Sequence, residues 1–220
     1  MSDLPFHLNL AEPLRILEKE KSLTLVNVGN SAAKSYIISE LFQKTNFQNI
    51  FWASTDESAE NIHLSAECFF DGNIVLLETE IKLEQYYEVL QDLNTDEKNL
   101  FVFEDYEAAL QQSLPTVEEI EAEKIIFKKG EKIKIFEVFE SLGKKGYTVA
   151  NDRIVQKGEF VRRGENFFIY PSNAKSCYRI ELFGDEVENI EMYEQMQDTK
   201  AEKTKKSLDT IEVYPASFED

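Results

Sequence analysis

Residues 158–183, GEFVRRGENFFIYPSNAKSCYRIELF, carry the pattern that decides the fold of the second half of the chain. Strict alternation in residues 177–183 gives a strand with two different faces. Its apolar face, which we expect to face the core, carries Tyr178, Ile180 and Leu182. Its other face carries Cys177, Arg179, Glu181 and Phe183. Glycine and proline bound the neighbouring runs, as expected at turns between antiparallel strands.

The residues on either side extend this pattern. Further β-prone runs bounded by turn residues occupy 147–150, 153–163, 166–170, 187–193 and 210–214. Apolar positions over residues 133–142 predict an amphipathic helix that Gly143 and Gly146 terminate. The polar, lysine-rich stretch 195–206 is typical of a solvated loop. The sequence therefore predicts a small, mostly antiparallel α+β domain.

The first half of the chain alternates between strand and helix patterns. The predicted strands are residues 23–28, 49–54, 74–77 and 100–103, and the helices between or after them are 33–42, 59–70 and 106–114. Such alternation predicts an α/β lobe with a parallel sheet and right-handed connections. We expect a first lobe over residues 1–124, a second domain over 125–208, and a strand in 209–220 that returns toward the first lobe.

Charge is distributed unevenly between the halves. Residues 1–125 hold 8 basic and 24 acidic side chains, whereas residues 126–220 hold 16 and 18. A phosphate backbone repels the first half. Lys128, Lys129, Lys144 and Lys145 are the strongest argument for DNA contact by the second half, but its charges nearly balance. We therefore expect no direct DNA binding from this chain.

Several classes of protein are disfavoured by composition. The sequence has no apolar run long enough to span a bilayer and no signal-peptide pattern, so we expect a cytoplasmic protein without membrane contact. Cys68 and Cys177 are far apart, which disfavours a disulfide framework or a zinc site. Only His7 and His63 are available as histidines, and neither neighbours an activated nucleophile. We expect no catalytic residue and no metal.

One turn imitates a phosphate-binding loop. Lys34 and Ser35 follow a predicted strand and open a helix, as the end of such a loop does. In that register Val28 and Ala33 replace the glycines, and Gly29 is one position out. We interpret the loop as degenerate and expect no cofactor. The alternative is a regulatory lobe in which Lys34, Ser35 and Asp105 bind ATP weakly.

Two groups of residues are candidates for partner contact. Phe183 is an aromatic residue on an otherwise polar strand face beside Arg179, a composition typical of an interface hot spot. Equally, Phe183 can pack under the turn at Gly184 as part of a satellite core. Arg162 and Arg163 are either an ordinary solvated pair or a guanidinium fork for an acidic partner surface.

Three linked motifs carry a family resemblance. They are GEFVRRGENFFIYP (158–171), YRIELFGDEVENI (178–190) and IEVYPAS (211–217). Their order and spacing resemble the partner-binding domain shared by UvrB and the transcription-repair coupling factor Mfd. The resemblance covers residues 125–216 well and residues 20–115 more faintly. The degenerate loop and the helix KIKIFEVFESLGKKGY (132–147) look more like Mfd than UvrB.

The resemblance implies a non-catalytic docking module of nucleotide excision repair that recruits UvrA in transcription-coupled repair. Carried over position by position, Arg163, Arg179 and Phe183 match the UvrA-contacting positions. Val161 stands where UvrB offers another arginine, which Arg162 is placed to replace. Mfd-like proteins continue into an RNA-polymerase-binding domain and a DNA translocase, so RNA polymerase and DNA would be partners of a full-length parent. A UvrB-like DNA-damage-binding fragment is a further alternative.

Overall fold

The computed structural model describes residues 10–20, 24, 28–53, 59–151, 154–194 and 203–218. The chain forms two compact units, Met1–Gln112 and Ser113–Asp220. The change in composition had placed the boundary after residue 124. Among the described residues, no helix has the length and apolar character needed to cross a bilayer.

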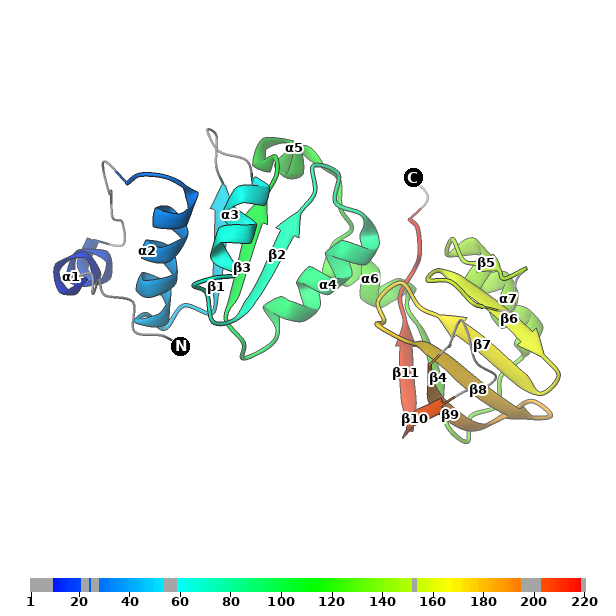
Figure 1. The fold of residues 1–220 in the computed structure, drawn as a ribbon. Coiled ribbons are helices and arrows are strands. Elements are labelled where there is room, and N and C mark those ends of the chain that lie inside the picture. The colour runs from blue at the N-terminus through cyan, green and yellow to red at the C-terminus, as the bar shows by residue number, and fades with distance from the viewer. Residues whose placement is uncertain are drawn as a thin grey trace. The chain divides into compact units, whose positions relative to one another are not determined.

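The first unit contains a small parallel sheet flanked by helices (Figure 1). Its elements are α1 (Ala11–Glu20), α2 (Ser31–Gln43), β1 (Asn49–Ala53), α3 (Ala59–Ala66), β2 (Asn73–Leu77), α4 (Leu83–Leu93), β3 (Asn99–Phe103) and α5 (Tyr106–Gln111). The strand order is β1-β3-β2, with both pairings parallel. Three of the four predicted strands are thus confirmed, and the strand predicted at 23–28 lies mostly outside the described residues. Helices α1 and α4 were not predicted.

The central strand β3 is covered on both sides, which explains its apolar run LFVF (100–103). Leu100 and Val102 pack with Phe42 of α2 and Ile62 of α3. Phe101, on the alternate face, is fully buried and stacks against Phe51 of β1, with ring centroids 5.1 Å apart. The sheet therefore has an apolar layer on each face, as expected for a parallel sheet.

A row of asparagines fixes the register of this sheet at its first residue pairs. Asn99 is fully buried and lies opposite both Asn49 and Asn73. Its Nδ2 donates to Asn49 Oδ1 at 2.9 Å and to the carbonyl oxygen of Asp92 at 2.9 Å. Asn73 Nδ2 in turn donates to Asp92 Oδ2 at 2.8 Å. A slip of one residue would leave these buried polar groups without partners.

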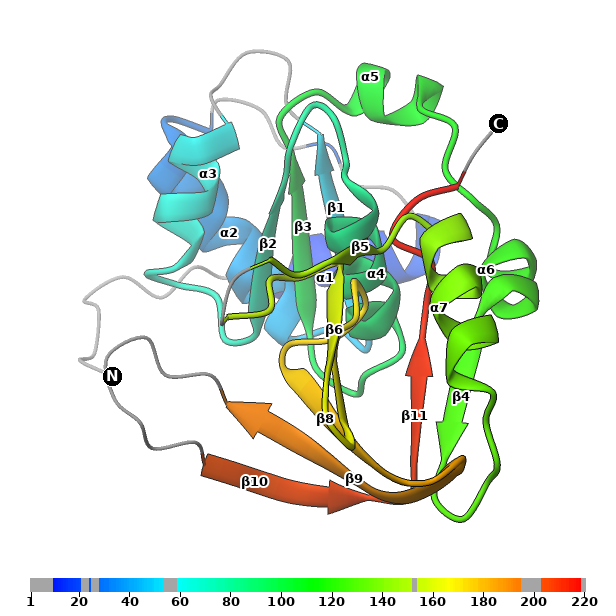
Figure 2. The same cartoon turned by 90° about the vertical axis from the view of Figure 1, so that its right-hand side faces the viewer.

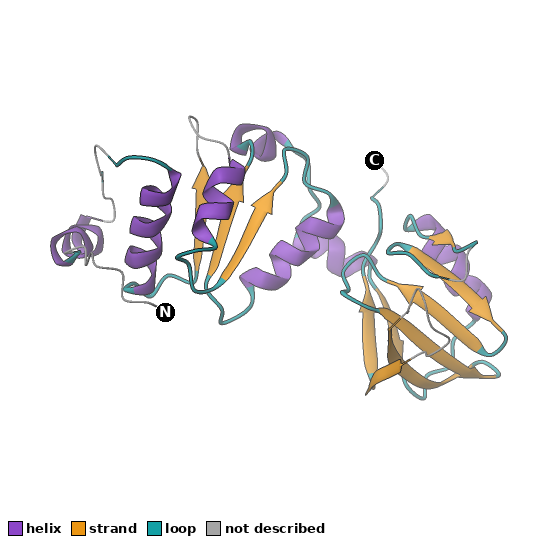
Figure 3. Ribbon diagram, viewed as in Figure 1, coloured by secondary structure: helices purple, strands orange, loops and turns teal. Residues whose placement is uncertain are grey.

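The second unit is built mainly from antiparallel strands (Figure 3). Its elements are α6 (Val117–Glu123), β4 (Ile125–Lys128), α7 (Ile135–Lys144), β5 (Thr148–Val149), β6 (Glu159–Arg163), β7 (Asn166–Tyr170), β8 (Cys177–Phe183), β9 (Glu186–Glu194), β10 (Lys203–Leu208) and β11 (Thr210–Val213). Six strands form a sheet in the order β10-β9-β8-β7-β6-β5, in which only β5 and β6 pair in parallel. Strands β4 and β11 form a separate antiparallel pair, and they lie side by side in Figure 2. The predicted α+β domain with mostly antiparallel strands is confirmed.

The two faces of the six-stranded sheet have different roles. One face packs against α7 and the β4–β11 pair in the main core, which contains Phe127, Leu142, Phe167, Ile180 and Ile190. The other face holds a smaller cluster at one end, formed by Ala150, Val155, Phe168 and Cys177. The rest of that second face carries mainly polar and charged side chains, together with the aromatic ring of Phe183.

Three details of the second unit differ from the predictions. Gly143 lies inside α7, and the helix ends at the following residues, where Gly146 has a φ of +83°. Strand β6 starts only at Glu159, six residues into the predicted run of 153–163. Residues 203–206, predicted as loop, belong to edge strand β10. The last strand, β11, pairs with β4 of the second unit, and its expected return toward the first lobe stays a prediction.

Candidate functional site

The candidate residues of the second unit sit on strands β6 and β8 and at the turns that follow them. Alternation along β8 buries Ile180 and Leu182 on the core face and turns Arg179 and Phe183 to the other face. A bulge falls between the Glu181 and Leu182 pairs. The alternation of β8 continues through it, because the extra residue lies on β9.

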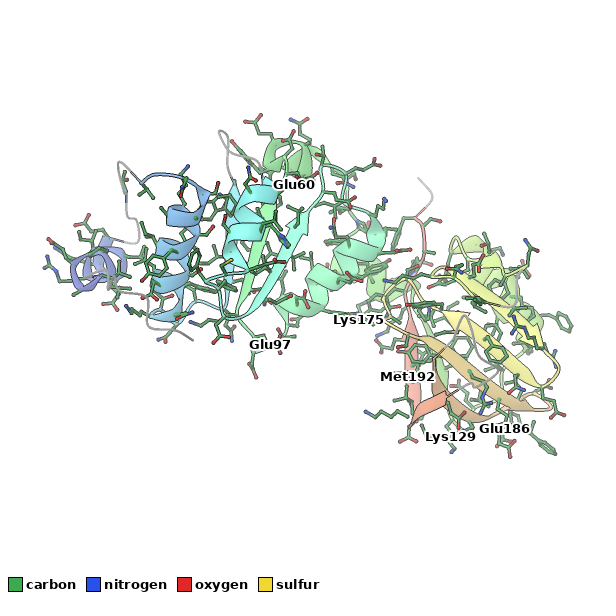
Figure 4. All side chains as sticks on the ribbon, viewed as in Figure 1. Glu60, Glu97, Lys129, Lys175, Glu186 and Met192 are labelled. Carbon is green, nitrogen blue, oxygen red and sulfur yellow. The ribbon has the colours of Figure 1, made fainter. Side chains whose placement is uncertain are left out.

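Phe183 is an exposed aromatic residue at the end of a hairpin strand. Its relative exposure is 74%. Glu186, labelled in Figure 4, is its cross-strand partner, and Gly184 begins the turn between them with a φ of +63°. Of the two interpretations that the sequence left open, the satellite-core one is therefore wrong. The ring is available to a partner.

Arg179 is partly buried and ion-paired. Its Nη2 contacts Oε2 of Glu191, the residue opposite it on β9. The side chains of Arg179 and Glu191 retain 27% and 16% of their exposure. One edge of the guanidinium is thus committed within the unit, while part of the side chain still reaches solvent.

The two arginines of the β6–β7 hairpin point to opposite faces of the sheet. Arg163 shares the face of Arg179, and its Cζ lies 5.3 Å from the centroid of the Phe168 ring. Arg162 is exposed, lies opposite the core residue Phe167, and donates from Nε to the carbonyl oxygen of Gly164 at 2.9 Å. Consecutive strand residues alternate in direction, so the two guanidinium groups do not form one fork.

The register brings Arg163 and Arg179 to one face through Phe168. Arg179 is opposite Phe168, and Phe168 is opposite Val161, the neighbour of Arg163 on that face of β6. Arg163 on β6 and Arg179 on β8 lie on either side of β7, with the ring of Phe168 between them, and the acids Glu181 and Glu191 share this face. The two guanidinium groups suit acidic side chains of a protein partner. We call Arg163, Phe168, Arg179 and Phe183 the arginine face.

Sequence reasoning missed Phe168 of the arginine face and Glu191, the ion-pair partner of Arg179. Phe168 was part of a quoted motif but received no role, and Glu191 was not singled out. The place of Phe168 follows from the register of β7 with β8, and that of Glu191 from the register of β8 with the bulged strand β9. Neither register can be read from alternation alone.

The thiol of Cys177, which is buried beside this surface, is expected to be unreactive. Cys177 is 2% exposed, and burial raises the pKa of its thiol from the ordinary 9.0 to about 12. It is therefore held in the unreactive, protonated form at neutral pH. Cys68, in contrast, is exposed.

The degenerate phosphate loop of the first unit has its polar groups committed within the protein. Asn30 caps α2, and its Oδ1 accepts the backbone N–H of Ala33 at 3.1 Å, where a phosphate-binding helix would offer that amide to its ligand. Ser35 is buried, and its hydroxyl lies 3.4 Å from the carbonyl oxygen of Ile62. Lys34 lies one helical turn into α2, and Gly29 is exposed.

Asp105, the acidic residue of the same alternative, is also engaged. It caps α5, and its Oδ1 accepts the N–H of Ala108 at 3.0 Å. Across the part of the chain that the structure describes, no group of histidine, cysteine and acidic side chains is arranged to hold a metal ion.

Comparison with known proteins places the similarity in the second unit. A family model described as the UvrB interaction domain matches residues 125–218. The UvrABC system protein B of Thermotoga neapolitana is 36% identical over 87 residues, which cover 40% of this chain and 12% of that protein. The corresponding protein of Herpetosiphon aurantiacus is 41% identical over 66 residues, covering 30% of this chain and 9% of that protein.

A second kind of relative matches more weakly. The Transcription-repair-coupling factor of Escherichia coli is 24% identical over 92 residues, which cover 42% of this chain and 8% of that protein. The chain thus spans at most 12% of the length of these relatives. Residues 125–218 are similar to the UvrB interaction domain, and the match to the UvrB proteins is stronger than the match to the coupling factor.

Proposed function

We propose that this chain is a non-catalytic docking module of nucleotide excision repair, and that the arginine face of its second unit recruits UvrA. The observation that carries the proposal is the exposed ring of Phe183 on the same sheet face as Arg179, within the region similar to the UvrB interaction domain. An exposed aromatic residue near arginines has the composition of a binding hot spot.

The two arginines of the surface support a protein partner with acidic side chains. Arg163 and Arg179 present guanidinium groups on either side of β7, and Phe183 adds apolar area at the edge of the same face. Hot-spot residues of this kind contribute about 2 kcal/mol or more to binding, which corresponds to roughly 30-fold in affinity.

Alanine substitution of Phe183 tests the role of the ring. We expect Phe183→Ala to weaken binding of UvrA to the immobilised chain by roughly 30-fold or more, measured by titration. Phe136→Ala is the matched control, because Phe136 is 78% exposed in the same unit but lies on α7. Equal effects of the two substitutions would remove Phe183 from the interface.

Charge reversal tests the arginines. Arg163→Glu and Arg179→Glu should each weaken UvrA binding by more than tenfold, and the loss should shrink as salt concentration rises. Lys144→Glu is the control, because Lys144 forms an exposed ion pair with Glu140 on α7. A wild-type chain that fails to bind UvrA would refute the proposed function itself.

We further propose that the chain works in transcription-coupled repair and that its first unit binds no nucleotide. The support is the side chains of Val28 and Ala33 at positions that a phosphate loop fills with glycine, and the capping of α2 by Asn30. RNA polymerase and DNA would then be partners of a longer parent protein. Saturable, Mg²⁺-dependent binding of labelled ATP that is lost in Lys34→Ala would contradict this assignment.

A further inference from the structure

We infer that Glu191 is a positioning residue for UvrA docking: it holds the guanidinium of Arg179 in the orientation that the partner meets. This inference rests on the proposed function and adds to it a residue that the family resemblance did not supply.

Glu191 is placed to act directly on Arg179. The two residues are register partners on β8 and β9, and Oε2 of Glu191 contacts Nη2 of Arg179. Both side chains are more than two thirds covered. Their attraction is therefore screened less than that of a surface ion pair.

The carboxylate is itself anchored. Asn189 Nδ2 donates to Glu191 Oε1 at 3.0 Å, and Ser207 Oγ lies 3.2 Å from Asn189 Oδ1. Ser207 belongs to β10 and is the register partner of Glu191. A chain of polar contacts thus crosses three strands and fixes the carboxylate before any partner arrives.

Arg179 has little else to orient it. Its Nε is enclosed and has no hydrogen-bond partner among the residues that the structure describes. Phe168 lies opposite Arg179 on β7 and limits where the side chain can go, but an aromatic ring supplies no acceptor oxygen. The direction of the guanidinium therefore depends on Glu191.

The same contact between Glu191 and Arg179 would also allow the opposite role, in which Glu191 hinders docking. If Glu191 acted as an internal competitor for the carboxylates of the partner, its removal would free Arg179 and tighten binding. The exposed remainder of Arg179 favours positioning, because one carboxylate on Nη2 leaves the other terminal nitrogen for a second acceptor. The two roles predict changes of opposite sign.

A double-mutant cycle on the full chain decides between them. UvrA is titrated against the wild-type chain, Glu191→Ala, Arg179→Ala and the double variant. We expect Glu191→Ala to weaken binding about tenfold in the wild-type background and to have no further effect once Arg179 is alanine. Glu191→Gln keeps an acceptor oxygen and should recover most of the affinity. A purely structural role would give the same loss in both backgrounds.

Glu188→Ala is the control for charge, because Glu188 is an exposed acid on the same strand. It should leave affinity within twofold of wild type. Tighter or unchanged binding by Glu191→Ala overturns the inference, as does an equal loss in the Arg179→Ala background. Failure of the wild-type chain to bind UvrA is a separate result, which refutes the proposed function and this inference together.

Discussion

Arg163 lies over the ring of Phe168, with 5.3 Å between its Cζ and the ring centroid. This contact joins β6 to β7 on the face that also carries Arg179. Phe168 is 7% exposed, so the ring is a fixed platform and not a mobile surface group. Packing of the Phe168 ring, as well as charge, therefore contributes to the structure of the candidate docking surface.

The Arg163–Phe168 contact predicts a modest contribution to stability. We expect Arg163→Gln to lower the free energy of unfolding by about 0.5–1 kcal/mol, measured in urea, because a partly exposed cation–π contact is lost. Arg162→Gln should change it by less than about 0.5 kcal/mol, since Arg162 is exposed and bonds only at its own turn among the contacts described. Equal effects of the two substitutions would count against a specific contact.

The asparagine row of the first unit predicts a larger effect. Asn99→Ala should lower the free energy of unfolding of that unit by about 2–3 kcal/mol, because the Oδ1 of Asn49 and backbone carbonyls lose a buried donor. Trp52, the single tryptophan of the sequence, lies in β1 and reports on this unit by fluorescence. Asn94→Ala is the control, because Asn94 donates to Leu90 at an exposed helix end. A loss below about 0.5 kcal/mol for Asn99→Ala would show that the row is dispensable.

The two thiols should differ sharply in reactivity. At neutral pH, a thiol reagent should modify Cys68 rapidly and Cys177 only on unfolding, because Cys68 is exposed and Cys177 is buried. Cys68→Ser should therefore abolish the fast phase of labelling. Rapid labelling that persists in Cys68→Ser would contradict the burial of Cys177.

Cys177 also predicts a loss of stability at alkaline pH. The folded chain retains the thiol proton up to a pKa of about 12, whereas the unfolded chain releases it near 9.0. Unfolding is therefore favoured as pH rises through this window. Relative to Cys177→Ala, the wild-type chain should lose about 1 kcal/mol of stability per pH unit above pH 9, measured by urea unfolding. Parallel pH profiles for the two proteins would rule out this linkage.

The surroundings of Gly146, at the end of α7, leave no room for a side chain at that position. The φ of Gly146 is +83°, and a Cβ there would approach side-chain and backbone atoms of Ser217 closer than 3.0 Å. Gly146→Ala should therefore destabilise the second unit by more than about 1 kcal/mol, measured by thermal unfolding. Gly130→Ala, at a similar φ of +80° but in open space, should cost less. A larger loss of stability in Gly130→Ala than in Gly146→Ala would mean that Ser217 moves aside at no cost.

Much of the second unit could be predicted from the sequence because its central strands carry strong patterns. Strands β7 and β8 have the predicted bounds, since apolar alternation and flanking turn residues coincide there. Edge strand β10 was taken for a loop, because its sequence KTKKSL has no apolar alternation. Lysines are common at sheet edges, where they discourage pairing with other chains.

The candidate site could be predicted only in part. Alternation along the sequence predicts that Arg179 and Phe183 lie on one face. Whether Phe183 is exposed depends on which residues cover the turn at Gly184, and the local sequence pattern carries no information about them. The ion pair of Arg179 with Glu191 depends on the pairing of β8 with a bulged β9. Opposite directions for Arg162 and Arg163 follow from simple alternation along β6, so the sequence itself argues against a fork of these two side chains.

The pairing of β4 with β11 has a further consequence. Ile125 and Val213 are register partners, so the polypeptide enters the sheet pair and leaves it at neighbouring points. A unit whose two ends meet can be spliced into a surface loop of an unrelated host without stretching that host. Such portability is consistent with the presence of similar segments in two different kinds of protein, a UvrABC system protein B and a Transcription-repair-coupling factor.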